Sequence, residues 1–217
     1  CRPARTVSGD YYDYGMADAG KMLFAIGDIS GKGISAALLM ATIQSILRSQ
    51  VYAMRLSGEL GQLNLGELAA RVNRQLCATT SQEKYSTLFL GLYDDRTRRL
   101  TYTNAGHLPP VVLGSGRTRQ LGVGGPVVGL FRDLRYEQAS VQLEPGNMLV
   151  AFTDGLTEVE NSYEEEYGIP RLVAFLERTA DNSHPERVID AVLAELQQWA
   201  PGREPVDDCT MLVACVR

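Results

Sequence analysis

The sequence has no uninterrupted apolar stretch of the roughly 20 residues that a membrane-spanning helix needs. Its longest apolar segment, residues 34–47, is interrupted by Ser35, Thr42, Gln44 and Ser45. Basic residues are not clustered either, and 21 Lys and Arg against 26 Asp and Glu give a formal net charge of −5. That balance is untypical of a nucleic-acid-binding protein. We therefore expect neither a membrane contact by this domain nor a nucleic-acid partner.

Cysteine is scarce, and the four thiols show neither CxxC nor zinc-finger spacing: Cys1, Cys77, Cys209 and Cys215. None is followed by an Arg six residues later, so the nucleophile loop of cysteine-dependent phosphatases is lacking. Buried free thiols in a reducing compartment are the simplest interpretation, which predicts a cytoplasmic location.

Internal repeats, low-complexity tracts and linker-like segments are also lacking. Hydrophobic residues make up 45% and charged residues 22% of the chain, as is typical of a globular protein. The sequence begins at Cys1 with neither a Met nor a signal peptide. We interpret residues 1–217 as a single domain, a C-terminal fragment of a longer protein whose regulatory N-terminal domain is not included.

Hydrophobic periodicity predicts hairpin-linked strands and two blocks of helices. The predicted strands are residues 7–14, 22–28, 86–93, 99–103, 111–113, 136–143, 147–152 and 209–216. The predicted helices are one that follows Gly33 and ends near Gln50, one from Asn64 to Leu76, and residues 169–178 and 185–199. This order predicts an α+β fold with two packed, largely antiparallel sheets.

Aspartates stand at the ends of several predicted strands, each beside small residues: Asp10, Asp28, Asp154 and the pair Asp207–Asp208. Taken singly, each is typical of an ordinary turn. If they were brought together in the fold, the crowded carboxylates would raise each other's pKa unless a cation neutralised them. Ligation by oxygen alone suits Mn²⁺ or Mg²⁺ rather than zinc.

Five short motifs follow one another along the chain: Gly9-Asp-Tyr-Tyr-Asp13, Gly27-Asp-Ile-Ser-Gly-Lys-Gly-Ile-Ser-Ala-Ala-Leu38, Asn104-Ala-Gly-His-Leu-Pro109, Thr153-Asp-Gly-Leu-Thr-Glu158 and Asp207-Asp-Cys-Thr210. With them the chain resembles the metal-dependent Ser/Thr protein phosphatases (the PPM superfamily), specifically the bacterial SpoIIE/RsbU-type branch. Each motif alone is weak, whereas the ordered set spans nearly the whole chain.

The resemblance implies an αββα sandwich, in which two antiparallel sheets are flanked by helices and two metal ions, Mn²⁺ or Mg²⁺, bind at one edge. The matching ligands are Asp10, Asp28, the carbonyl of Ile29, Asp154 and Asp207. Asp28 would bridge both ions, and Asp28 and Asp154 would be the catalytic carboxylates. Asp208 stays open as the alternative to Asp207.

Other roles in the site are less well matched. Better-known eukaryotic members carry a His two residues after the bridging Asp, where this chain has Ser30, so no general acid is identified. Lys32 is a candidate for substrate binding, although a solvated loop lysine fits it equally well. Asp13 would act through a water or only form hydrogen bonds in the loop. His107 is interpreted as part of a turn and His184 as a surface residue.

The resemblance implies direct hydrolysis of phosphoserine or phosphothreonine on a protein, with no phospho-enzyme. The implied substrate is a phosphorylated anti-anti-sigma (STAS-domain) factor in bacterial partner-switching, a signalling pathway of the stress response. The helices at 35–50 and 64–76 would act as a switch set by the N-terminal region, and a homodimer is compatible with this interpretation. Two alternatives remain: a pseudophosphatase that binds a phosphoprotein without turnover, and a metal that only stabilises the fold.

Overall fold

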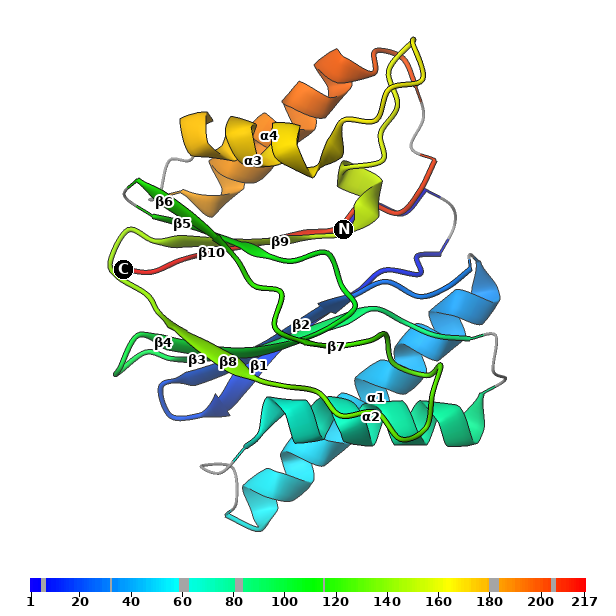
Figure 1. Cartoon of the computed structure of the whole chain (residues 1–217), viewed down its shortest axis with the longest axis vertical. Helices are drawn as coiled ribbons and strands as arrows, with labels where there is room; N and C mark the ends of the chain where they lie inside the picture. Colours follow the sequence, from blue (N-terminus) through cyan, green and yellow to red (C-terminus); the bar gives the residue numbers. More distant parts are fainter. Residues whose placement is uncertain are drawn as a thin grey trace. The chain divides into compact units, whose positions relative to one another are not determined.

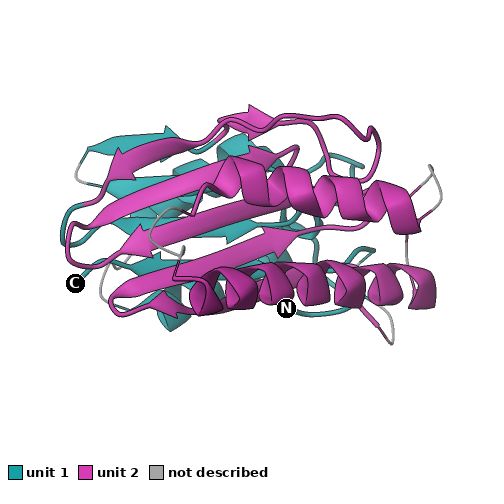
Figure 2. Cartoon of the chain, turned by 90° about the horizontal axis from the view of Figure 1, so that it is seen from below, with its two compact units in different colours: residues 1–6, 108–121, 144–217 teal, residues 7–107, 122–143 magenta. Residues whose placement is uncertain are grey.

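The computed structural model describes residues 1–4, 7–31, 33–58, 63–80, 84–114, 116–179, 184–203 and 206–217. The chain forms two compact units (Figure 2). Unit 1 comprises residues 1–6, 108–121 and 144–217, and unit 2 comprises residues 7–107 and 122–143. The organisation of residues 1–217 as one domain stays a prediction.

Unit 2 is built on a sheet in the order β1-β2-β3-β4-β7, with β8 also paired to β4. Its strands are β1 (Tyr11–Asp18), β2 (Lys21–Gly27), β3 (Leu88–Asp94), β4 (Arg99–Ala105), β7 (Gly124–Gly125) and β8 (Ala139–Gln142). All pairs are antiparallel except β4 with β7. Tight hairpins join β1 to β2 and β3 to β4, whereas β2 and β3 pair across the segment that contains both helices of this unit.

Two helices, α1 (Ile34–Leu56) and α2 (Leu65–Thr79), cover one face of this sheet (Figures 1 and 2). Asn64 is the N-cap of α2, because its side chain accepts a hydrogen bond from the Glu67 amide at 2.9 Å. The apolar stripes of both helices form the core with side chains such as Ile43, Leu68 and Leu90, each at most 2% exposed. Burial of these stripes holds the helices on the sheet.

Helix α1 continues six residues beyond the predicted end, because the first left-handed residue after it is Gly58, at a φ of 72°. By length and composition alone α1 could cross a membrane. Core helices satisfy the same criteria, and α1 has a buried face that includes Ala36, Leu39 and Ile46. We therefore describe it as a core helix of unit 2.

Unit 1 contains a sheet in the order β10-β9-β5-β6 with antiparallel pairing throughout. Its strands are β5 (Val111–Gly114), β6 (Arg117–Gln120), β9 (Met148–Phe152) and β10 (Met211–Cys215). A single 3₁₀ turn (Asp154–Leu156) follows β9, and two helices, α3 (Gly168–Thr179) and α4 (Pro185–Trp199), pack on the sheet (Figure 1). Leu172, Val192 and Phe152 meet in its core.

The predicted α+β class with two largely antiparallel sheets is confirmed. Strand β6 was not predicted, because Arg117 and Arg119 leave it without an apolar alternation at the sheet edge. The prediction of buried thiols is wrong: Cys1 is exposed, and the other three cysteines, all free, are half-buried.

Candidate metal and phosphate site

Asp10 and Asp28 flank the last paired residues of the β1–β2 hairpin in unit 2. Asp10 is 5% exposed and Asp28 is half-buried. The two loops lie against each other, because a Cβ added to Gly9 would be 3.6 Å from the carbonyl oxygen of Ile29. Unit 2 therefore brings the loops of three predicted ligands, Asp10, Asp28 and Ile29, to one end of its hairpin.

The backbone of Asp28 is fixed by residues that precede β3. Its amide donates to Thr87 Oγ1 at 3.0 Å, and its carbonyl accepts from the Thr87 amide and from Ser86 Oγ, both at 2.8 Å. Thr87 Oγ1 lies 2.9 Å from Nδ1 of His107. The peptide groups of Asp28 are thus satisfied by Ser86 and Thr87, which hold the start of its loop in place.

His107 lies in a tight turn after β4, as predicted. The Asn104 side chain closes this turn, because its Oδ1 accepts from the His107 amide at 2.7 Å and its Nδ2 donates to the His107 carbonyl at 3.0 Å. Gly106 has a φ of 68°, and a Cβ there would be 2.6 Å from Cγ1 of Val127. The turn needs a glycine, and it buries His107 to 5% exposure.

In unit 1, the loops of Asp154 and Asp207–Asp208 adjoin. The Thr153 amide donates to the Thr210 carbonyl at 3.1 Å, and the Thr210 amide donates to Thr153 Oγ1 at 3.0 Å. A Cβ on Gly155 would collide with the carbonyl of Asp208, so the two backbones touch at that point. The antiparallel pairing of β9 with β10 accounts for this, since it places the end of one strand beside the start of the other.

The two neighbouring aspartates of this loop differ in their surroundings. Asp208 is 7% exposed, and its Oδ1 accepts a hydrogen bond from the Ala4 amide at 2.8 Å. Asp207 is half-buried, and its Oδ1 accepts from the Asp208 amide at 2.8 Å. Asp208 thus ties the loop to the N-terminal segment, and the assignment of Asp207 as the ligand stays a prediction.

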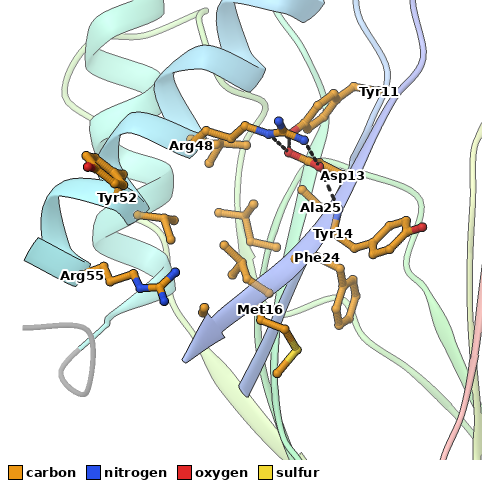
Figure 3. Close-up of a pocket in the computed structure, with 15 residues that line it drawn as sticks. Tyr11, Asp13, Tyr14, Met16, Phe24, Ala25, Arg48, Tyr52 and Arg55 are labelled. Atoms are coloured by element: carbon orange, nitrogen blue, oxygen red, sulfur yellow. Dashed lines mark hydrogen bonds and ion pairs between the residues drawn. The ribbon is translucent and has the colours of Figure 1, made fainter. Parts of the chain in front are cut away.

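Asp13 binds an arginine of α1. Nε and Nη2 of Arg48 each donate to its carboxylate at 2.8 Å (Figure 3). This pair is the main reason why the pKa of Asp13 lies below its ordinary value, and the Tyr11 hydroxyl also donates to the carboxylate, at 3.3 Å. Of the two predicted roles, the structure shows Asp13 as a hydrogen-bonding residue that joins β1 to α1.

A pocket of about 350 Å³ lies beside this ion pair, between β1 and the C-terminal half of α1. Leu47, Val51 and Leu90 are among its apolar lining residues, and Tyr52 and Arg55 extend from α1 beside it (Figure 3). No predicted metal ligand lines the pocket, so it is separate from the carboxylate loops.

The loop that follows Asp28 contributes two further observations. Ser30 is bound to the backbone of Tyr85, because its amide donates to the Tyr85 carbonyl at 2.9 Å and its Oγ accepts from the Tyr85 amide at 3.0 Å. Lys32, the predicted substrate-binding residue, lies outside the described residues.

The structure adds a cation that the sequence analysis missed. Nζ of Lys84 is 3.5 Å from Ser35 Oγ, and a Cβ on Gly31 would be 3.4 Å from the same atom. Lys84 therefore reaches the loop after Asp28 from a distant part of the chain. No local motif marks it, because its position follows from the pairing of β2 with β3.

The donor set fits a hard divalent cation, since every predicted ligand supplies oxygen. Among the residues that the structure describes, no group of three or more His, Cys, Asp and Glu side chains is arranged to hold a metal ion. The predicted ligand loops instead adjoin pairwise, those of Asp10 and Asp28 in unit 2 and those of Asp154 and Asp207 in unit 1. Their assembly around shared ions stays a prediction.

Solved structures identify the fold. The SiaA-PP2C domain of Pseudomonas aeruginosa superposes with a TM-score of 0.85 at 21% identity, over 100% of this chain and 84% of that one. The PP2C phosphatase domain of SpoIIE from Bacillus subtilis, solved with a fragment of its regulatory domain, gives a TM-score of 0.80 at 23% identity, over 96% and 58% of the two chains. The chain thus has the fold of PP2C-type phosphatase domains.

The family model described as Stage II sporulation protein E (SpoIIE) matches residues 18–217, so the chain belongs to the SpoIIE family. Protein IcfG of Synechocystis sp. is 31% identical over 236 residues, which cover 97% of this chain and 36% of IcfG. The phosphoserine phosphatase RsbU of Bacillus subtilis is 30% identical over 215 residues, which cover 97% of this chain and 60% of RsbU. The chain therefore spans only part of these relatives, and the predicted SpoIIE/RsbU-type membership is confirmed.

Proposed function

We propose that this domain is a protein-serine/threonine phosphatase that hydrolyses phosphoserine or phosphothreonine and depends on Mn²⁺ or Mg²⁺. Membership of the SpoIIE family carries the proposal, because the matched residues 18–217 include Asp28, Asp154 and Asp207 at their strand ends. RsbU and RsbP of Bacillus subtilis are both named phosphoserine phosphatases.

Two ions would be held by the carboxylates of Asp10, Asp28, Asp154 and Asp207 and by the carbonyl of Ile29. When bound, such ions lower the pKa of a water and neutralise charge on the phosphoryl oxygens. Asp28 and Asp154 would hold the ions in position. Ser86 and Thr87 in turn hold the Asp28 backbone. A related structure, that of RsbX, was solved in complex with magnesium, at a TM-score of 0.68 and 17% identity.

A cationic side chain near the loop that follows Asp28 would bind the phosphate. Lys84 is a candidate because it reaches Ser35 and Gly31 at the start of α1, and Lys32 stays a second candidate. The N-terminal end of a helix also favours anions, since its amide groups point toward them.

The natural substrate would be a phosphorylated STAS-domain protein, an anti-anti-sigma factor of a cytoplasmic partner-switching pathway. A regulatory domain outside residues 1–217, if the protein is longer, and homodimerisation would control access or activity. Comparison with RsbU and with a bacterial stressosome protein of TM-score 0.66 supports this context.

Regulation would act through α1 and α2. Helix α1 begins six residues after Asp28, and its Ala36 Cβ is 3.4 Å from where a Cβ of Gly9 would lie. Farther along, Arg48 binds Asp13 on β1. A shift of α1 would therefore displace the loops of both Asp10 and Asp28.

Phosphate release from a serine-phosphorylated STAS-domain protein tests the proposal, with an unrelated phosphoprotein as the comparison. We expect turnover that needs Mn²⁺ or Mg²⁺ and that favours the STAS substrate. Tight binding of the phosphoprotein without turnover would instead show a pseudophosphatase. A metal-dependent rise in melting temperature with neither binding nor turnover would show a purely structural ion.

A further inference from the structure

We infer that His107 is a positioning residue for Asp28 and that it acts through the hydroxyl of Thr87. Three links form the chain from Asp28 to His107: the amide of Asp28 donates to Thr87 Oγ1 at 3.0 Å, Thr87 Oγ1 lies 2.9 Å from His107 Nδ1, and the Asn104 side chain binds the His107 backbone. The inference rests on the proposed role of Asp28 as a metal ligand.

The direction of these bonds follows from the single proton of a hydroxyl group. Thr87 Oγ1 accepts from the Asp28 amide, so its own proton must go to another acceptor. Two are within reach, His107 Nδ1 at 2.9 Å and the Asp28 carbonyl at 3.4 Å, and the shorter contact is the better hydrogen bond. We therefore assign Nδ1 of the His107 ring as the acceptor, which places the ring proton on Nε2.

The imidazole is suited to this task because its backbone is held by hydrogen bonds and its side chain is buried. His107 is 5% exposed and Asn104 is 3% exposed, and two hydrogen bonds between them close the turn. A Cβ on Gly106 would also come within 2.9 Å of the Val127 amide nitrogen, so the neighbouring segment packs against the turn. A fixed acceptor selects one orientation of the Thr87 hydroxyl, and that orientation fixes the start of the Asp28 loop.

The effect on a metal site follows from geometry. Ligating carboxylates need support from residues that do not touch the ion, and the loss of such support weakens metal affinity by about 10–100-fold. Thr87 and Ser86 together bind both peptide groups of Asp28. Without the Thr87 hydroxyl, the Asp28 amide loses its acceptor in the protein. The loop that carries the carboxylate is then held less firmly.

Calorimetric titration with Mn²⁺ tests the inference in four variants. Thr87→Val and His107→Leu should each weaken Mn²⁺ binding by about tenfold or more. Thr87→Ser, which keeps the hydroxyl, and His107→Asn, which keeps an acceptor near Nδ1, should stay close to the wild type. The Thr87→Val/His107→Leu double variant should be no weaker than the single variants, because both break one chain of bonds.

Thr103→Val is the matched control. It removes another threonine hydroxyl from the same unit, one that is fully buried and donates to the Glu137 carbonyl at 2.7 Å. It should lower the melting temperature and leave Mn²⁺ affinity unchanged. Equal loss of affinity in Thr103→Val and Thr87→Val, or unchanged affinity in Thr87→Val, would overturn the inference.

The tautomer of His107 gives a second test that needs no change at the site. The chain contains two histidines, so a His184→Gln variant isolates the His107 resonances in ¹⁵N NMR spectra. We expect a neutral imidazole protonated on Nε2, and a proton on Nδ1 would overturn the assignment. Wild-type protein that binds Mn²⁺ but releases no phosphate would contradict the proposed function alone. Wild-type protein that binds no Mn²⁺ would overturn the ligand role of Asp28 and this inference together.

Discussion

The two pairs of candidate ligand loops are held in different ways. In unit 2, the peptide groups of Asp28 bind the side chains of Ser86 and Thr87, and Thr87 is itself held by His107. In unit 1, the loop of Asp154 is held by strand pairing and by the close approach of Gly155 to a neighbouring carbonyl. We therefore expect removal of one hydroxyl to disturb the first arrangement, and addition of one methyl group to disturb the second.

The largest effect that separates neighbouring residues in unit 1 concerns Asp207 and Asp208. Asp207→Asn should lower kcat/KM by about a thousandfold, because a ligand carboxylate loses its charge. Asp208→Asn should keep most activity, since an amide oxygen can still accept the hydrogen bond from Ala4. Steady-state phosphate release measures both, and the reverse pattern would show that Asp208 is the ligand.

Added methyl groups test the backbone contacts of each unit. Gly155→Ala would push against the Asp208 carbonyl and Gly27→Ala against the Thr87 carbonyl, so each should lower the free energy of unfolding by about 1–3 kcal/mol. Gly15→Ala is the control, because nothing lies within 4 Å of its added Cβ. Urea unfolding measures the three variants, and equal stability of all three would show that the close approaches relax without strain.

A smaller effect is expected at the phosphate. Lys84→Met should raise KM for a phosphomonoester about tenfold with little change in kcat, because it removes one cation from the loop beside Ser35. Lys21→Met, at the start of β2, removes the same charge at the opposite end of the strand from Asp28. If both variants keep the wild-type KM, Lys84 does not contact the phosphate.

The smallest effect concerns the link between β1 and α1. Arg48 holds the pKa of Asp13 below its ordinary value of 3.8, so the pair stabilises the folded state above that pH and ceases to do so as pH falls through the folded-state pKa. Asp13→Asn should lower the melting temperature at neutral pH by at most about 4 °C. The difference in melting temperature between Asp13→Asn and the wild type should disappear at acid pH. A difference that persists at low pH would mean that the variant loses packing contacts and not the charge interaction with Arg48.

Much of the fold could be predicted from the sequence because apolar periodicity is strong there. Helix 185–199 was predicted with both ends correct, since Pro185 suits a first turn and Val188 and Val192 share a buried face. Strand β6 and the last turns of α1 could not be predicted, because short charged edges and exposed helix ends carry weak periodicity.

The residue types of the candidate site could be predicted from the sequence, but the tertiary contacts that hold these residues in position could not. The strand-end aspartates and the turn around His107 stand out as motifs along the chain. The bond from Thr87 to His107 and the reach of Lys84 to Ser35 join residues 20 and 49 positions apart, and no spacing rule connects them. Tertiary pairing of β2, β3 and β4 creates both contacts.

The most direct test of the account is phosphate release from a generic phosphomonoester by three proteins: the wild type, Asp28→Asn, and Asp95→Asn as a control for loss of one exposed carboxylate. Each is assayed with Mn²⁺ and with EDTA. The account predicts turnover by the wild type and the control in Mn²⁺, none in EDTA, and a loss of about a thousandfold or more in Asp28→Asn. Turnover that survives EDTA, or an Asp28→Asn variant as active as the control, would contradict a metal-dependent phosphatase built on Asp28.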